Sequence, residues 1–237
     1  MLFRSTGIIT NANSLWLNDK PFKKDLELAL NREVRLMNDA NCFTLSEAVD
    51  GAGKDYKSIF GIIIGTGFGG GLSYNKSIIE GSNQIAGDWG HQPLPYPTKE
   101  EQETKISCPS NNCGRPLCAE QFMSGIGFKD RFNQKHDTNF TSEEIVKLDL
   151  ENDPRANLEL GLYEDRMARL MAVMIGIFDP DAIILGGGMS NIDRFYKNIP
   201  SLIPKYTFSN KVETKVLKNL HGDSSGVRGA AWLWNNG

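Results

Sequence analysis

No stretch of this chain has the roughly eighteen consecutive apolar residues that a membrane-spanning helix needs. Residues 1–6 lack the apolar core of a secretory signal, and no run of lysine and arginine offers a surface for nucleic acid. The net charge is −3, from 26 basic and 29 acidic residues. We therefore expect a cytoplasmic protein with neither membrane nor nucleic acid among its partners.

Cysteine is scarce as well, with 4 among 237 residues. Cys42 stands apart from the others, which argues against the disulfide framework of a small secreted domain. The remaining three cysteines follow His91 and are Cys108, Cys113 and Cys118. One imidazole and three thiolates complete a tetrahedral structural zinc site. The pattern favours zinc, and a disulfide or simple burial of the thiols stay open as alternatives.

Hydrophobic patterns predict strands over 32–37, 58–64 and 181–185, with 72–74 returning as the hairpin partner of the second strand. They predict helices over 40–49, 224–234 and from Pro154 onward, where Asp153 provides an N-cap. The alternation of strands and helices indicates an α/β fold. The segment 92–107 is charged, contains proline and has no periodicity, which predicts an exposed loop. One stripe of the long helix is expected in the core: Leu158, Leu162, Met167, Leu170, Met171, Met174 and Phe178.

Two glycine clusters follow predicted strands. The first is Gly65-Thr66-Gly67-Phe68-Gly69-Gly70-Gly71, and the second is Gly186-Gly187-Gly188. Glycine lets backbone amides approach a phosphate closely, although neither cluster matches the Walker or dinucleotide patterns. A tight hairpin would also explain the first cluster, and a strand-to-helix turn the second. Two such clusters in one chain favour a nucleotide site.

Carboxylates stand beside these motifs. Asp39 follows Asn38 at the end of a predicted strand, where it could cap a helix or take a proton from a substrate hydroxyl. Asp88 lies three residues before His91, and Glu120 lies two residues after Cys118. If a metal fixes both segments, their carboxylates can bind sugar hydroxyls, whereas isolated surface carboxylates would simply be solvated.

In their order along the chain, these motifs resemble those of ROK-family sugar kinases, and the segments 11–18 and 221–234 resemble the bacterial fructokinase (manno-fructokinase) branch. The similarity spans essentially the whole chain. It implies an actin-like ATPase (ribonuclease H-like) fold of two α/β lobes. Residues 1–57 would be the remnant of a truncated N-terminal lobe, with a helix at 222–237 packing back onto it. Residues 58–221 would form the C-terminal lobe.

The resemblance also implies a function, the ATP- and Mg²⁺-dependent phosphorylation of a hexose by a homodimer. For this branch the hexose is fructose, at its 6-hydroxyl, with mannose as a second substrate; the alternative within the family is an N-acetylhexosamine or glucose kinase, with N-acetylhexosamine as the nearest rival substrate. Asp39 matches the general base, and Asn38 matches a sugar ligand. The other sugar-contacting positions are Asp88, His91 and Glu120, with His91 also on zinc. The stretches facing ATP are Gly65 to Leu72 and Gly186 to Gly188.

The chain departs from the family pattern at three places. The family's opening Asp-x-Gly-Gly-Thr loop, which binds ATP phosphates, is absent. Asp88 replaces the usual glutamate, and Asn111 stands where the first zinc cysteine is expected, with Cys108 three residues earlier. The absent loop keeps open a second hypothesis, a sugar-binding fragment without catalysis. The family's DNA-binding repressors need an N-terminal helix-turn-helix, for which the sequence has no room.

Overall fold

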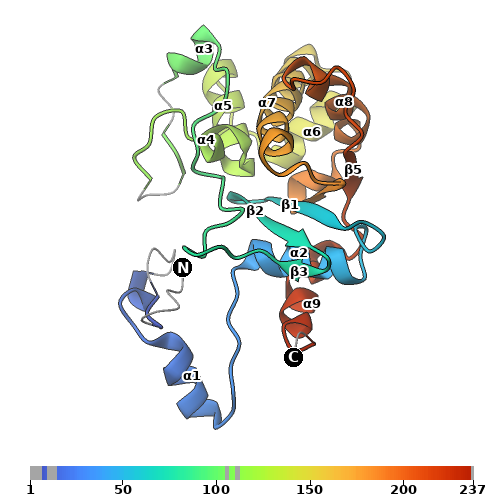
Figure 1. The fold of residues 1–237 in the computed structure, drawn as a ribbon. Helices are drawn as coiled ribbons and strands as arrows, with labels where there is room; N and C mark the ends of the chain where they lie inside the picture. Colours follow the sequence, from blue (N-terminus) through green and yellow to red (C-terminus); the bar gives the residue numbers. More distant parts are fainter. Residues whose placement is uncertain (1–6, 10–14, 105–106, 110–112, 236–237) are drawn as a thin grey trace.

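The computed structural model describes residues 7–9, 15–104, 107–109 and 113–235 (Figure 1). One five-stranded sheet has the strand order β3-β2-β1-β4-β5. Its strands are β1 (Ser58–Ile64), β2 (Phe68–Tyr74), β3 (Ser77–Ile78), β4 (Ala182–Gly186) and β5 (Lys215–Lys218). Strand β4 is parallel to both β1 and β5, whereas β2 is antiparallel to both β1 and β3. The strands predicted at 58–64 and 181–185 are confirmed, the second with a shift of one residue.

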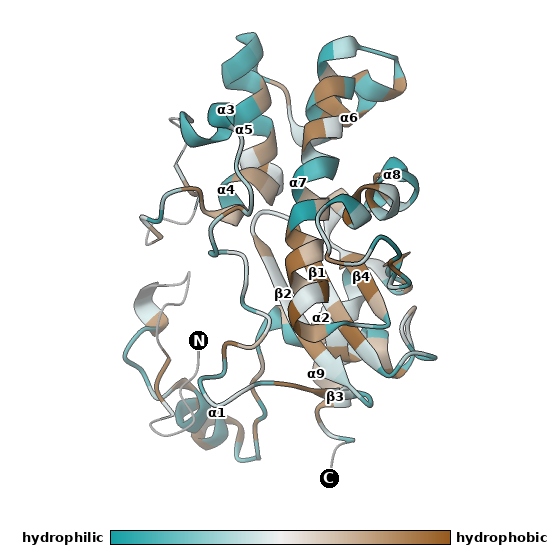
Figure 2. Ribbon diagram, turned by 45° about the horizontal axis from the view of Figure 1, so that its top comes forward, coloured by the Kyte–Doolittle hydropathy of each residue, from teal (hydrophilic) through white to brown (hydrophobic). Residues whose placement is uncertain are grey.

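Helices cover both faces of the sheet (Figures 1 and 2). One face carries α4 (Ala119–Met123), α5 (Gly125–His136), α6 (Ser142–Leu150), α7 (Pro154–Phe178) and α8 (Arg194–Leu202). The other carries α2 (Asp39–Val49) and α9 (Ser225–Trp232), while α1 (Phe22–Leu30) and α3 (Lys99–Gln102) lie farther out. None of the described helices is long and apolar enough to cross a membrane. This layered arrangement confirms the predicted α/β class.

The long helix α7 supplies much of the core. It begins as predicted, with Pro154 in its first turn and the Asp153 carboxylate accepting a hydrogen bond from the Arg155 amide at 2.8 Å. The predicted stripe is correct from Met167 onward but wrong at Leu158, which is 53% exposed. The buried stripe continues toward the helix start through Tyr163, Leu160 and Ala156. The 3.6-residue period therefore holds along α7, but at the start of the helix the buried face differs from the predicted one.

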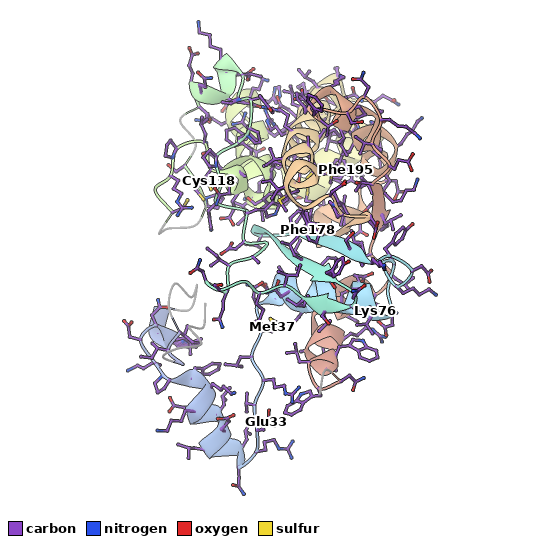
Figure 3. The ribbon with its side chains drawn as sticks, in the orientation of Figure 1. Glu33, Met37, Lys76, Cys118, Phe178 and Phe195 are labelled. Carbon is purple, nitrogen blue, oxygen red and sulfur yellow. The ribbon has the colours of Figure 1, made fainter. Side chains whose placement is uncertain are left out.

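The strand predicted over 32–37 is wrong. Residues 33–38 have no strand assignment, because within the described chain no neighbouring strand pairs with them. This segment carries Glu33 and Met37 and links α2 to α1, which stands away from the sheet (Figure 3). Helix α1 has no buried residue. The apolar pattern of this segment is typical of a strand, but a strand also requires a neighbouring strand with which to form hydrogen bonds.

The segment predicted as an exposed loop over 92–107 is anchored on α7 through its described residues 92–104. It includes α3, whose N-cap Thr98 forms a capping box with Glu101. Glu101 is only 2% exposed, and its carboxylate accepts bonds from Arg166 at 2.6 Å and from Arg169 at 2.8 and 3.0 Å. Arg169 also donates to the backbone carbonyls of Pro95 and Tyr96. Buried charges and the core residue Leu94 hold this segment together, and neither forms a periodic pattern that the sequence would reveal.

Helix α9 packs on α2 through a glycine. A Cβ added at Gly229 would lie 1.7 Å from the Cys42 carbonyl oxygen, so the two backbones are in direct contact. Buried Glu47 fixes the junction by accepting bonds from the Ser225 hydroxyl at 2.8 Å and the Leu220 amide at 3.0 Å. The helix predicted over 224–234 is confirmed as α9, and just beyond it the half-exposed Trp234 ring packs against Arg35, whose guanidinium carbon lies 4.5 Å from the ring centroid.

Candidate functional site

Two glycine turns lie side by side at the carboxyl ends of β1 and β4. The strands pair in parallel, with Ile63 opposite Gly186, so the residues that follow each strand are neighbours. Gly187 has a φ of +80°, and a Cβ there would lie 2.4 Å from the Ile64 carbonyl oxygen. Only glycine fits this contact. Open α/β sheets bind ligands at this edge.

The first glycine turn is shorter than the sequence predicted. Only residues 65–67 form the turn, because β2 already begins at Phe68 and pairs with β1 along its full length. Gly69, Gly70, Gly71 and Leu72 are therefore strand residues, and not part of a loop as the sequence suggested. In the second cluster Gly186 ends β4, and a short 3₁₀ helix, Gly188–Asn191, follows. A Cβ at Gly65 or Gly188 would meet nothing within 4 Å, so both turns border open space.

Asn38 and Asp39 lie at the start of α2. Asn38, not Asp39, is the N-cap, because its side-chain oxygen accepts bonds from the amides of Ala40 at 2.9 Å and Asn41 at 3.3 Å. Asp39 is the first helical residue, is exposed, and also accepts from the Ala40 amide at 2.9 Å. The cap therefore does not depend on the Asp39 carboxylate, which leaves the proton-accepting interpretation open.

The segment 87–91 packs directly against β2. A Cβ at Gly87 would be 2.7 Å from the Gly71 Cα, and Trp89 packs on Phe60 and Phe68 with ring centroids 4.7 and 5.1 Å apart. Asp88, which lies between Gly87 and Trp89 in the sequence, is exposed. The start of α2 approaches the same strand, because a Cβ at Gly71 would be 3.0 Å from the Ala40 carbonyl. Gly71 is thus a common neighbour of the segments that carry Asp39 and Asp88.

One side-chain cluster could hold a metal. One ligand atom from each of His91, Cys108, Cys113 and Cys118 lies within 4.8 Å of the others. His91 Nδ1 is 3.4 Å from Cys118 Sγ and 3.9 Å from Cys108 Sγ. Zinc bonds of about 2.0–2.3 Å in a tetrahedron place ligand atoms about 3.5–3.8 Å apart, so the cluster fits a structural zinc. All four cysteines are free thiols.

The structure therefore brings Cys108 to the other ligands despite its altered spacing. The residue at the expected first-cysteine position, Asn111, lies outside the described residues, as do residues 11–14 of the segment 11–18 that resembles the fructokinase branch. The fourth cysteine, Cys42, is buried in α2. Burial, and to a smaller degree the charge of Asp39, raises the pKa of Cys42 to about 11, so this thiol stays protonated at neutral pH.

Glu120 joins the cluster to the first glycine turn. It is buried near the start of α4, and its Oε2 accepts a bond from the Phe68 amide at 3.2 Å. Its Oε1 is 3.6 Å from the Cys108 thiol. Sequence reasoning placed Glu120 beside the metal but missed Gly125, whose amide donates to the Gly65 carbonyl at 2.8 Å. No local signal marks Gly125, because the contact depends on how α4 packs against the sheet.

Removing one cluster thiol is expected to release the metal. In Cys113→Ser and Cys118→Ser, zinc affinity should fall by more than about 100-fold, the upper cost of losing a residue that merely supports a ligand. The unfolding temperature of the zinc-loaded protein should fall with it, because metal binding contributes to folding. Metal content measured by atomic absorption after gel filtration checks this, with Cys42→Ser as the control that keeps its zinc. Equal metal content in wild type and both cluster variants would contradict the assignment.

Known proteins resemble this chain along nearly its whole length. A family model described as the ROK family matches residues 3–236. An N-acetyl-D-glucosamine kinase of Vibrio atlanticus is 38% identical over 214 residues, covering 90% of this chain and 71% of that relative. Fructokinase is not the name that these relatives carry.

Solved structures show the same fold. A ROK hexokinase from Thermus thermophilus superposes with a TM-score of 0.80 at 24% identity, covering 97% of this chain and 74% of that one. A ROK family glucokinase from Streptomyces griseus, solved with glucose and AMPPNP, gives 0.78 at 23% identity, covering 93% and 74%. The predicted actin-like ATPase fold is thereby confirmed. By family model, by sequence identity and by fold, the chain belongs to the ROK family.

Proposed function

We propose that this chain is an ATP-dependent hexose kinase that transfers the γ-phosphoryl group to a sugar hydroxyl. The observation that carries the proposal is the meeting of three segments around one strand. The start of α2 with Asp39, the segment 87–91 with Asp88 and His91, and the turn 65–67 all border β2. Relatives 38% identical to the chain are named as sugar kinases, which supports the same activity.

Phosphoryl transfer depends mostly on positioning and on stabilising charge. In the proposed mechanism Asp39 accepts the proton of the attacking hydroxyl, and Asn38, Asp88, His91 and Glu120 bind the remaining sugar hydroxyls. The turns at 65–67 and 187–188 face the phosphates of ATP, with which Mg²⁺ enters. A zinc ion held by His91, Cys108, Cys113 and Cys118 would have all its positions filled by protein, so it would serve to hold the segments that bear these residues.

The names of the relatives favour N-acetyl-D-glucosamine as the first sugar to test. Fructose is the second candidate, because the segment 221–234 resembles the fructokinase branch. A 6-hydroxyl is available on both sugars, and Asp88 is one methylene shorter than the family's usual glutamate. A displacement of about 1 Å at a positioned group can cost about 10²-fold in rate, so Asp88 is expected to affect the choice between hexoses.

A coupled ADP-release assay on the zinc-loaded chain, with Mg-ATP and a panel of hexoses, tests the proposal. We expect sugar-dependent ADP formation, with the highest kcat/KM for N-acetyl-D-glucosamine. A higher kcat/KM for fructose would instead favour the fructokinase branch. Folded, zinc-loaded protein that binds a hexose by calorimetry but forms no ADP would contradict the kinase proposal and favour a sugar-binding protein without catalysis.

A further inference from the structure

Phe68, the residue where the first glycine turn enters β2, contacts both segments that carry metal ligands. Its amide donates to Oε2 of Glu120, two residues after Cys118, at 3.2 Å. Its carbonyl oxygen lies so near Gly90 that a Cβ there would be 1.8 Å away. Gly90 directly precedes His91. One residue of β2 therefore touches the chain next to two predicted metal ligands.

The two ligand-bearing segments are also bound to each other. The Glu120 amide donates to the Gly90 carbonyl at 2.8 Å, and the Ala119 amide donates to the Gln92 carbonyl at 2.8 Å. The Cys118 thiol is 3.5 Å from the same Gly90 oxygen. The segments form a short antiparallel pair, with the metal ligands on it and Phe68 against it (Figure 3 labels Cys118 on this segment).

Helix α4 holds the glycine turn at both ends. At one end Glu120 binds Phe68, and at the other the Gly125 amide, just past the helix, donates to the Gly65 carbonyl at 2.8 Å. Inside the turn the Glu120 carboxylate lies against the backbone, because a Cβ at Gly67 would be 3.1 Å from its Oε2. Gly125 is itself fixed by the Ser142 hydroxyl, which donates to its carbonyl at 2.8 Å.

We propose that Glu120 is a positioning residue that couples the metal cluster to the glycine turn 65–67, so that metal occupancy controls the shape of the nucleotide side of the site. A metal bound to His91 and Cys118 would cross-link the two segments that Phe68 contacts. Without that cross-link, hydrogen bonds of about 1 kcal/mol each would restrain them. The inference rests on the proposed function only in assigning the turn to ATP phosphates.

Hydrogen exchange of the full chain tests the coupling without sugar or nucleotide. Removing zinc with a chelator should speed exchange of the Phe68 amide by about 5-fold or more, the lower end of ordinary coupling between sites. In Glu120→Ala the amide should exchange fast with and without zinc. Glu120→Gln keeps an acceptor oxygen and should restore slow exchange in the zinc-loaded protein. Unchanged exchange at Phe68 after complete zinc release would overturn the proposal.

Exchange in β4 serves as the control, because a general loss of structure on chelation would speed that strand as well. In that event a matched pair of zinc-loaded variants decides. Gly67→Ala must displace the Glu120 carboxylate, whereas Gly65→Ala places its methyl group in open space. Coupling between two binding equilibria is reciprocal, so the zinc affinity of Gly67→Ala, measured by competition with a chelator, should be about 5-fold lower than that of wild type, and that of Gly65→Ala should equal wild type. Equal zinc affinity of the two variants would overturn the coupling.

The kinase assay and these two measurements fail independently. A chain without turnover can still lose Phe68 protection when zinc leaves, which would retain the coupling and reject the kinase proposal. A chain that forms ADP, but whose Phe68 exchange does not change when zinc is removed, would retain the kinase proposal and reject the coupling. Neither result depends on which hexose the site accepts.

Discussion

Replacing Asp39 by asparagine is expected to lower kcat for hexose phosphorylation by about 10²–10⁴-fold, the usual contribution of a positioned general base. Asparagine has nearly the shape of aspartate but cannot accept the hydroxyl proton. The helix start should be unaffected, because Asn38 provides the cap. Sugar affinity measured by calorimetry should change little, so the loss appears in kcat rather than in KM.

The control for this variant is Asp55→Asn, which removes an exposed carboxylate near the opposite end of β1 and should leave turnover unchanged. Zinc content and the unfolding temperature of both variants should equal those of wild type. An Asp39→Asn protein that keeps more than about a tenth of the wild-type kcat would show that another group takes the proton, or that ATP chemistry needs no base here.

Much of the site could be predicted from residue types, because its chemistry is local in the sequence. His91 and the three later cysteines carry the preferred zinc ligands, and the structure gathers them within 4.8 Å. The two glycine clusters follow strands whose apolar patterns are plain, and parallel pairing of β1 with β4 makes them neighbours. The sequence predicted both strands and the glycine residues that follow them, whereas the order of the strands in the sheet comes from the structure.

The errors come from contacts between distant parts of the chain. The glycines at 69–71 looked like loop, but β2 forms there because β1 pairs with it, and Gly71 lies against Ala40 in α2. The segment 32–37 has the apolar residues of a strand but no described partner. The hydrogen bond between Glu120 and Phe68 joins residues 52 positions apart, and no residue pattern near either of them predicts it. Periodicity records which face is buried, but not what covers it.

The second large effect is expected far from the reacting groups, at the buried Glu101. Glu101→Gln should destabilise the protein by about 3–5 kcal/mol, because it leaves the Arg166 guanidinium buried without its carboxylate and leaves the buried Arg169 with Asp165 alone. For a protein of this size that corresponds to a fall in unfolding temperature of about 6–20 °C. Urea denaturation should give a lower midpoint for the variant. The neighbouring Glu100→Gln removes an exposed carboxylate and is the matched control, expected within about 0.5 kcal/mol of wild type.

The same carboxylate makes stability depend on pH. Burial alone would raise the pKa of Glu101, but bonds from Arg169, the Thr98 amide and Arg166 outweigh it and lower the pKa from 4.5 to about 2. The unfolded chain therefore binds this proton more readily than the folded one. The resulting stabilisation, about 3 kcal/mol, is complete above pH 4.5 and is lost as the pH falls toward 2.

The difference in unfolding free energy between wild type and Glu101→Gln should accordingly shrink as the pH falls from about 5 to about 2. Denaturation curves at several pH values in that range measure it. A difference that stays constant would mean that the loss in the variant comes from packing rather than from charge. The anchored segment 92–104 leads directly toward Cys108. Weakening it is therefore expected to reduce zinc retention also, through loss of restraint on that ligand rather than through any change in the ligand atoms.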